Sequence, residues 1–259
     1  MSVCKTGPGY RTQVRLLAAS YNIHCCVGMD GCRDVSRIAE VIRETGAQIV
    51  GLQEVISHSD NEVSQMTHLA ELTGFSAIPG PTIYREDSHY GNIVLTRWPV
   101  LHVRRMSLNV SRREPRGAVD ILLDVMGHQV RVITTHLGLK RAERLRQVRK
   151  LLEFLEEPVG DCVVLLGDIN EWAPWRLSLR SLHQHFGKIP HLATFPTPCP
   201  ILALDRIWVK PRMALEELRV HDSDLARSAS DHLPVVAEIV MGQALNSDSS
   251  TVDCDPAIP

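Results

Sequence analysis

The stretch that most constrains the fold runs from Val163 to Asn170 and reads Val-Val-Leu-Leu-Gly-Asp-Ile-Asn. Four apolar residues that end at a glycine predict a strand buried on both faces. Asp168 and Asn170 then follow at its carboxyl end, the edge at which open sheets place their chemistry. Because Asp and Asn are also common turn residues, this stretch indicates a functional site only if other strands end in matching groups.

Other expected strands do carry polar groups at their ends. The expected strands are 14–22, 49–54, 92–96, 117–125, 130–135, 204–209 and 235–240. The polar residues at or beside their ends are Asn22, Glu54, Arg116, His136, Asp205, Asp231 and His232. An aliphatic core needs no acids, amides or histidines at so many strand ends, so the pattern predicts one shared polar site.

Helical patterns alternate with these strands. We expect helices over 35–45, capped by Asp34 and Gly46, over 62–73 before Gly74, and over 140–157, with a short irregular helical stretch in 172–186. The residues 126–128 form a turn, which makes 117–135 an antiparallel hairpin. Interleaved strands and helices with one such hairpin predict an α/β fold of two packed mixed sheets, each covered by helices.

The 140–157 helix has a polar face with Arg141, Arg144 and Lys150. Such a face is more often a solvated helix surface than a nucleic-acid patch, and we favour the solvated surface.

Composition places the chain among soluble globular proteins. Its 259 residues are 44% hydrophobic and 22% charged, and the formal net charge of −2 gives no overall basic field for non-specific nucleic-acid binding. No repeat or linker divides residues 13–241. We therefore expect a flexible lead over 1–12, a single domain over 13–241 and a disordered tail over 242–259.

Cysteine usage and hydropathy bear on location. The seven cysteines form no Cys-x-x-Cys pair, which favours reduced thiols and a reducing compartment. The first residues lack a signal-peptide core, and no segment approaches the roughly 20 apolar residues of a membrane-spanning helix. We expect a cytoplasmic monomer without a transmembrane segment.

Eight short motifs together resemble the endonuclease/exonuclease/phosphatase superfamily, which includes deoxyribonucleases, abasic-site endonucleases, sphingomyelinases and inositol-polyphosphate phosphatases. They occur in family order as SYN (20–22), LQEV (52–55), GNIVLTR (91–97), EPRGA (114–118), TTHLG (134–138), GDIN (167–170), LDRIWV (204–209) and SDHLPV (230–235). The resemblance covers nearly all of residues 13–241. It implies a four-layer α/β/β/α sandwich of two packed mixed sheets flanked by helices.

The resemblance also implies a metal site. Glu54 matches the carboxylate that holds the catalytic divalent cation, with Asn22 beside it, and Asp231 resembles an additional carboxylate on the metal side. Oxygen ligands of this kind favour Mg²⁺, with Mn²⁺ as a possible substitute.

The remaining roles implied by the resemblance are catalytic and phosphate-binding. Asp168 and Asn170 resemble the pair that orients the attacking water or steadies the phosphate, and His232 resembles the histidine that acts on the phosphate with Asp205 as its partner. His136 matches the histidine of the deoxyribonuclease and sphingomyelinase branches, and Arg116 their phosphate-contacting arginine. Asn170, His136 and Asn22 are further candidates for phosphate contacts. Whether His232 or Asp168 takes the first proton stays open.

The resulting hypothesis is a divalent-metal-dependent phosphodiesterase for a small or lipid-linked phosphodiester. The histidine-type site, the near-neutral charge and the short loops after Glu54 and His136 favour it. One alternative is a Mg²⁺-dependent nuclease acting on DNA or RNA, for which Arg104, Arg105, Arg112, Arg113 and the helix that begins at Lys140 could supply a basic patch. The others are a phosphomonoesterase and a non-catalytic binding module.

Overall fold

Two mixed sheets form the centre of the computed structural model, which describes residues 13–59, 64–86, 88–157 and 159–242. The first sheet has the order β10-β11-β1-β2-β4-β3 and the second the order β5-β6-β7-β8-β9. The first is built from β1 (Val14–Asn22), β2 (Ile49–Ser59), β3 (Ser76–Tyr84), β4 (Ser88–Thr96), β10 (Leu215–Val220) and β11 (Val235–Met241). The second is built from β5 (Val100–Ser107), β6 (Gly117–Val125), β7 (His128–His136), β8 (Cys162–Asp168) and β9 (Asp205–Lys210).

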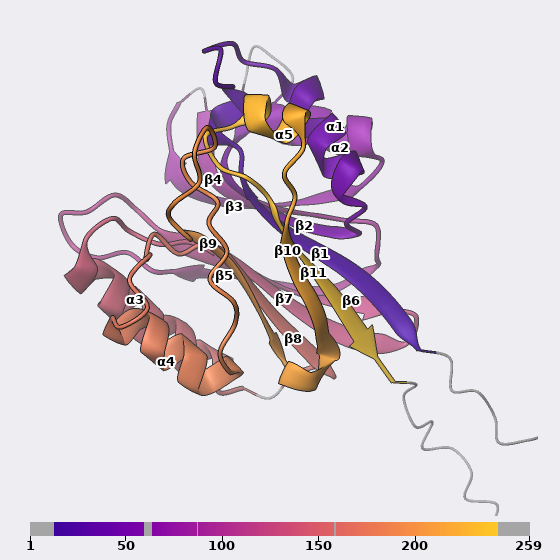
Figure 1. Ribbon diagram of the computed structural model, residues 1–259, viewed down its shortest axis with the longest axis vertical. Helices are drawn as coiled ribbons and strands as arrows, with labels where there is room; N and C mark the ends of the chain where they lie inside the picture. The colour runs from indigo at the N-terminus through magenta and orange to yellow at the C-terminus, as the bar shows by residue number, and fades with distance from the viewer. Residues whose placement is uncertain (1–12, 60–63, 87, 158, 243–259) are drawn as a thin grey trace, which may run out of the picture.

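Helices cover the outer face of each sheet, which gives the expected four layers (Figure 1). The helices are α1 (Val35–Thr45), α2 (Gln65–Thr73), α3 (Arg141–Leu155), α4 (Leu177–Phe186) and α5 (Asp224–Ala229), with short 3-10 turns η1 (His24–Cys26) and η2 (Arg212–Ala214). Side chains of α1, α2 and α5 pack on the first sheet, and those of α3 and α4 on the second. None of the helices in the described part of the chain combines the length and apolarity that crossing a bilayer requires.

Sequence signals at the helix ends act as expected. The Asp34 side chain accepts a hydrogen bond from the backbone of Arg37 at 3.1 Å, and Gly46 ends α1 in the left-handed conformation with φ of 68°. Gly74 ends α2 in the same way with φ of 71°. The expected lead 1–12 and all of the expected tail except Gly242 lie outside the described residues.

A buried aliphatic core fills the space between the two sheets. Leu16 and Val94 from the first sheet belong to the same cluster as Val132 and Val164 from the second. Gly51 lies at a close approach of the two sheets, because a Cβ atom there would lie 2.0 Å from Cδ1 of Leu166.

Polar bonds also join the sheets near the ends of their central strands. Nε2 of Gln53 donates to Oγ1 of Thr134 at 3.2 Å, and Nδ2 of Asn92 donates to the carbonyl of Gly117 at 3.1 Å. Packing and hydrogen bonds together fix the register of one sheet against the other.

Two sequence predictions are wrong in detail. The strand expected to end at Glu54 continues to Ser59, with a register shift between Leu52 and Val55. Arg144, placed on the solvated face of its helix, is buried because it forms an ion pair of 2.9 Å with Glu171. Three strands were not predicted at all: β3, β5 and β10.

Candidate active site

Strand register in the second sheet places three predicted site residues side by side. In the parallel pair β7–β8, His136 is opposite Asp168, and in the antiparallel pair β8–β9, Asp168 is opposite Asp205. Asp205 begins its strand whereas Asp168 ends one, so antiparallel pairing brings the two acids to the same edge. All three side chains are buried.

Gly167 allows this edge to form. Its φ of 150° lies outside the range that other residues favour, and a Cβ atom would lie 1.9 Å from the carbonyl oxygen of Thr135. A glycine directly before Asp168 is therefore a steric requirement of the β7–β8 pairing.

The first sheet contributes Asn22 from the end of β1 and Glu54 from the bulge in β2. Nδ2 of Asn22 donates to Oε1 of Glu54 and to Oδ2 of Asp168, both at 3.1 Å. Glu54 has a left-handed φ of 61°, a conformation that is uncommon for a non-glycine residue and concentrates at functional sites. The Asn22 amide thus joins carboxylates from opposite sheets.

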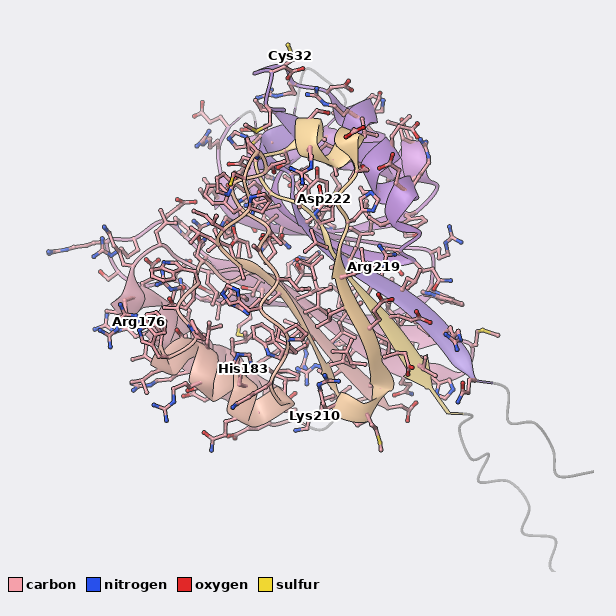
Figure 2. All side chains as sticks on the ribbon, in the orientation of Figure 1. Cys32, Arg176, His183, Lys210, Arg219 and Asp222 are labelled. Atoms are coloured by element: carbon pink, nitrogen blue, oxygen red, sulfur yellow. The ribbon has the colours of Figure 1, made fainter. Side chains whose placement is uncertain are left out.

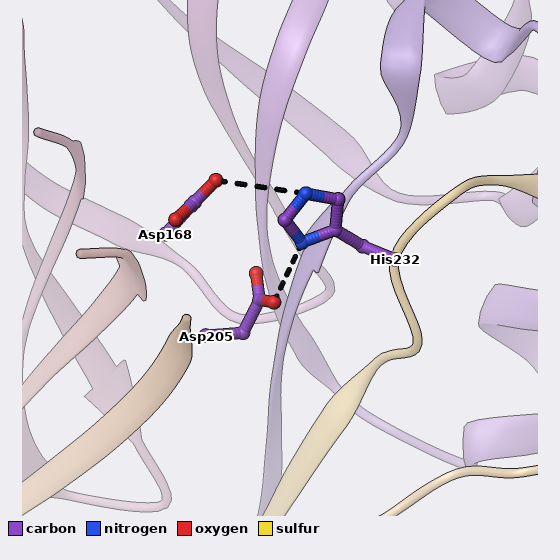
Figure 3. A group of neighbouring side chains, drawn as sticks. All are labelled: Asp168, Asp205 and His232. Carbon is purple, nitrogen blue, oxygen red and sulfur yellow. Dashed lines mark hydrogen bonds and ion pairs between the residues drawn. The ribbon is translucent and has the colours of Figure 1, made fainter. Parts of the chain in front are cut away.

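His232 forms a buried pair with Asp205 (Figure 3). Its Nδ1 atom lies 2.7 Å from Oδ2 of Asp205, and its Nε2 atom lies 3.8 Å from Oδ2 of Asp168. Burial alone lowers the pKa of an imidazole, but Asp205, through its charge and hydrogen bond, together with the charges of Asp168 and Asp231 raises the pKa of His232 to about 10. The pair therefore holds His232 as an imidazolium with Nε2 facing Asp168.

The segment before β11 reaches this position because it is tied to the end of β1. The Ser230 hydroxyl donates to the Asn22 carbonyl at 2.8 Å and accepts from the His232 backbone at 3.3 Å.

His136 lies on the other side of Asp168 in a different environment. Its Nδ1 atom contacts the Arg116 guanidinium at 3.1 Å, and its Nε2 atom lies 3.0 Å from the Asn170 amide and 3.4 Å from Oδ2 of Asp168. The pKa of His136 is lowered to about 3, chiefly by burial and also by the Arg116 charge, against the opposing effect of Asp168. His136 is therefore neutral where His232 is charged.

Asn170 completes the group from the loop after β8. It has a left-handed φ of 53°, and its backbone N–H donates to Oδ1 of Asp168 at 2.9 Å. Seven predicted residues therefore form one connected set: Asn22, Glu54, His136, Asp168, Asn170, Asp205 and His232, with Arg116 attached through His136.

Asp231 stands apart from this set. Its carboxylate lies 3.4 Å from the Ser230 hydroxyl oxygen, whose proton is donated to Asn22, and 3.9 Å from Nδ1 of His24. The structure does not bring it into contact with Glu54, and its role as a metal ligand stays a prediction.

The oxygen chemistry around Glu54 suits a hard divalent cation. Glu54 is only partly buried, and its one described side-chain hydrogen bond comes from Nδ2 of Asn22. The same nitrogen also donates to Asp168, so a second carboxylate lies close to Glu54. The Asn22 oxygen accepts one hydrogen bond from the His24 backbone at 3.1 Å and keeps a second lone pair, so its role as a metal ligand stays a prediction.

A second set of possible ligands suits a cation less well. Asp168, Asp205 and His232 bring ligand atoms within 4.8 Å of one another in the described part of the chain. Oδ2 of Asp205 is already occupied by Nδ1 of His232 and by the Thr194 hydroxyl. Glu54 is therefore the better centre for a cation.

Thr194 is a site residue that the sequence did not reveal. Its hydroxyl donates to Oδ2 of Asp205 at 2.6 Å, on the same oxygen that faces His232. Thr194 lies in a proline-rich loop, and its spacing from Asp205 in the sequence gives no signal of the contact. The ring of the neighbouring Phe195 packs against His232, with ring centroids 4.8 Å apart.

Known proteins resemble this chain along most of its length. Residues 19–232 match the model of the Endonuclease/Exonuclease/phosphatase family. An uncharacterized protein of Escherichia coli (strain K12), YbhP, is 31% identical over 220 residues, which cover 78% of this chain and 87% of YbhP.

Solved structures share the fold at low identity. A mannosyl-6-phosphatase of Bacteroides thetaiotaomicron has a TM-score of 0.68 with 18% identity over 87% of this chain and 100% of its own. D. rerio TDP2, solved with a single strand DNA product, has a TM-score of 0.65 with 18% identity over 86% of this chain and 98% of its own. Since the family match extends from β1 to His232 itself, the chain belongs to the endonuclease/exonuclease/phosphatase family, whose members are phosphoester-hydrolysing enzymes.

Proposed function

We propose that the protein is a divalent-metal-dependent phosphodiesterase that hydrolyses a small or lipid-linked phosphodiester by in-line attack of water. The observation that carries this proposal is the surroundings of Oδ2 of Asp168. This atom lies 3.1 Å from the Asn22 amide, 3.4 Å from His136 and 3.8 Å from His232. A proton acceptor between two imidazoles, with an arginine behind one of them, suits an anionic phosphate and a water molecule.

Each side chain has a role that follows from its contacts. Asp168, held through its other oxygen by the Asn170 backbone, orients the water and accepts its proton. His232 has its Nδ1 atom occupied by Asp205, so its Nε2 atom is available to donate to a phosphate oxygen. Arg116, whose buried Nε atom has no hydrogen-bond partner, contacts the phosphate beside His136.

Glu54, positioned by Asn22, would hold the cation, and Mg²⁺ is the best match to its hard oxygen ligands. The family in general uses a divalent metal. A cation bound there supplies Lewis-acid polarisation of the phosphate and stabilises the leaving oxygen.

A small cleft beside Arg116 supports a substrate with a compact substituent. The cleft has a volume of about 250 Å³ and shares Arg116 with the catalytic group. Its other walls include Thr82, Tyr84, Met106 and Asn109. Arg105 also lines it, but its Nε atom donates to the Pro79 carbonyl at 2.7 Å.

The basic patch considered for a nuclease is weaker than the sequence indicated. Arg104 contacts Asp120 at 2.9 Å and Glu157 at 2.6 Å, so two carboxylates neutralise its charge. A nuclease depends on unpaired cations along the nucleic-acid backbone, and this pairing removes one of the four arginines considered for such a patch.

The test is a substrate panel in Mg²⁺ buffer with bis(para-nitrophenyl) phosphate, para-nitrophenyl phosphate, plasmid DNA and phospholipid vesicles. We expect turnover of the diester and of a phospholipid, little turnover of the monoester, and a rate on the soluble diester that changes weakly with salt. Asp168→Asn serves as the inactive control. Preferential cleavage of plasmid DNA with a steep loss at high salt would identify a nuclease instead, and preference for the monoester would identify a phosphatase.

A further inference from the structure

Large apolar side chains are exposed around one end of the second sheet. Among the described residues eleven such side chains are exposed, and four of them come from two short segments that follow His136 and Asn170. These four, here named the aromatic rim, are Leu139, Trp172, Trp175 and Leu177, with exposed fractions of 67%, 46%, 63% and 49%. Because Leu139 lies three residues after His136 and Trp172 two residues after Asn170, the rim borders the catalytic group.

The two segments are held together, so the rim has a defined shape. Arg144 donates to the Leu139 carbonyl at 2.7 Å and forms an ion pair with Glu171 at 2.9 Å. The Trp172 and Trp175 rings pack edge to face with centroids 5.9 Å apart. This contact orders both rings while leaving about half of each exposed.

The charges around the rim have one sign. Lys140, Arg141 and Arg180 are exposed and Arg176 is partly exposed, whereas the acids of the same segments, Glu143 and Glu171, are buried. Figure 2 shows Arg176 at the start of α4 and His183 farther along it. The rim therefore presents apolar side chains together with positive charge that has no ion-pair partner among the residues the structure describes.

A groove continues from Trp175 along α4. Its volume is about 570 Å³, and Pro174, Trp175, Arg180, His183, Gln184 and Lys188 line it. The two charged residues in its lining, Arg180 and Lys188, are both cations, so the groove suits an anionic group bound next to the exposed Trp175.

We propose that the aromatic rim and its cations dock the protein onto an anionic phospholipid surface, and this inference rests on the proposed function. Tryptophan favours the membrane–water interface, where its ring is in the apolar region and its N–H is hydrated. Cations near such a surface are attracted by anionic headgroups. A single-stranded nucleic acid would use stacking on aromatic faces, but two of the four rim residues are leucines, which cannot stack. Docking would bring the catalytic group next to headgroup phosphodiesters.

The experiment measures binding of the full chain to sedimented vesicles. One set of vesicles contains equal parts of phosphatidylcholine and phosphatidylglycerol, and the other contains phosphatidylcholine alone. We expect clear binding to the anionic set and much weaker binding to the neutral set. Trp175→Ala should weaken anionic-vesicle binding about 10-fold through lost apolar burial. Arg180→Glu should weaken it roughly 25-fold, since each unit of charge contributes about five-fold.

Matched controls change similar groups elsewhere. Met126→Ala removes a side chain that is 71% exposed at the opposite end of β7, and Arg219→Glu reverses a charge on β10 (Figure 2). Both should bind anionic vesicles like the unmodified protein. Equal binding by Trp175→Ala, or absence of binding by the unmodified protein in low salt, would overturn the docking proposal. The proposal would also be overturned if the protein bound a single-stranded oligonucleotide in a way that required Trp175 but did not bind vesicles.

A second measurement separates the two proposals. The unmodified protein is assayed on soluble bis(para-nitrophenyl) phosphate without vesicles. Turnover of this diester without vesicle binding would reject docking alone, whereas vesicle binding without turnover of any diester would reject the proposed phosphodiesterase function.

Discussion

Nδ1 of His232 lies 2.7 Å from Oδ2 of Asp205, and the same oxygen accepts a hydrogen bond of 2.6 Å from Thr194. The acid therefore has two fixed partners, and the imidazole has one orientation, with Nε2 toward Asp168. This pair comes from segments 27 residues apart in the sequence, so its geometry depends on the β8–β9 and β1–β11 pairings.

The first prediction concerns this pair. His232→Ala should lower the rate by about 10²- to 10⁴-fold, the usual range for a general acid–base group. Asp205→Asn should cause a smaller but large loss, because the imidazole loses both its orientation and the stabilisation of its charge. In a double-mutant cycle on the soluble diester, the double variant should be scarcely slower than His232→Ala. Additive losses would show that the two residues act independently.

The second prediction uses the opposite pKa shifts of the two site histidines. Burial lowers the pKa of His136 to about 3, so below about pH 6.5 the unfolded chain binds a proton that the folded chain does not. Its contribution therefore destabilises the fold as pH falls. For His232, burial lowers the pKa but Asp205 raises it, and the net pKa is about 10. The stability that its protonated form contributes is therefore complete below about pH 6.5 and is lost as pH rises toward 10.

Each histidine should contribute a slope of about 1.4 kcal/mol per pH unit on its own side of neutrality. Urea unfolding in the presence of a chelator measures this. His136→Gln should flatten the acid side of the profile, and His232→Gln the alkaline side. If His136→Gln flattened the alkaline side and His232→Gln the acid side, the opposite pKa shifts of the two histidines would be contradicted.

The third prediction concerns the metal. EDTA should abolish hydrolysis, Mg²⁺ or Mn²⁺ should restore it, and Ca²⁺ should support it poorly because it is larger and less demanding in geometry. Glu54→Gln should raise the Mg²⁺ concentration needed for half-maximal rate or end activity. Gln48→Glu, at a position outside the site whose side chain accepts from the Leu17 backbone, is the control. Full activity in thoroughly metal-free buffer would exclude the metal-dependent mechanism.

The fourth prediction concerns the contact between the sheets. Gly51→Ala should lower the free energy of unfolding by about 1–3 kcal/mol, because the new methyl group would overlap Leu166 and Thr134. Gly242→Ala is the control, since nothing lies within 4 Å of the added Cβ there. Urea unfolding measures both, and equal stabilities would mean that the sheets can separate without strain.

Sequence patterns predicted the central strands because those strands are buried on both faces. The three missed strands, β3, β5 and β10, all lie at sheet edges. β3 contains Pro79, Gly80 and Pro81, which are depleted in strand interiors and are tolerated at an edge where one side needs no ladder bonds. In β5 most residues are exposed or only partly buried, so its sequence lacks the clear alternation that signals a strand.

The site could be predicted as a set of residue types but not as a set of contacts. Strand ends gave Asn22, Glu54 and Asp168, because a polar residue after an apolar run is visible in sequence. The left-handed backbone at Glu54 was not visible, since no glycine marks it. Thr194 and Arg144 were missed because each acts through a tertiary contact to an acid that local spacing does not encode.

The Asn22 amide bridges a carboxylate of one sheet and a carboxylate of the other, so the proposed catalytic centre lies on the seam between two separately hydrogen-bonded layers. Sliding of one layer over the other would change the spacing of Glu54 and Asp168 without altering either residue. A displacement of about 1 Å can reduce a rate about 100-fold. The aliphatic side chains at the interface, such as Val94 and Val164, therefore act as alignment elements, and relatives with identical catalytic residues can differ in rate through the shape of this interior alone.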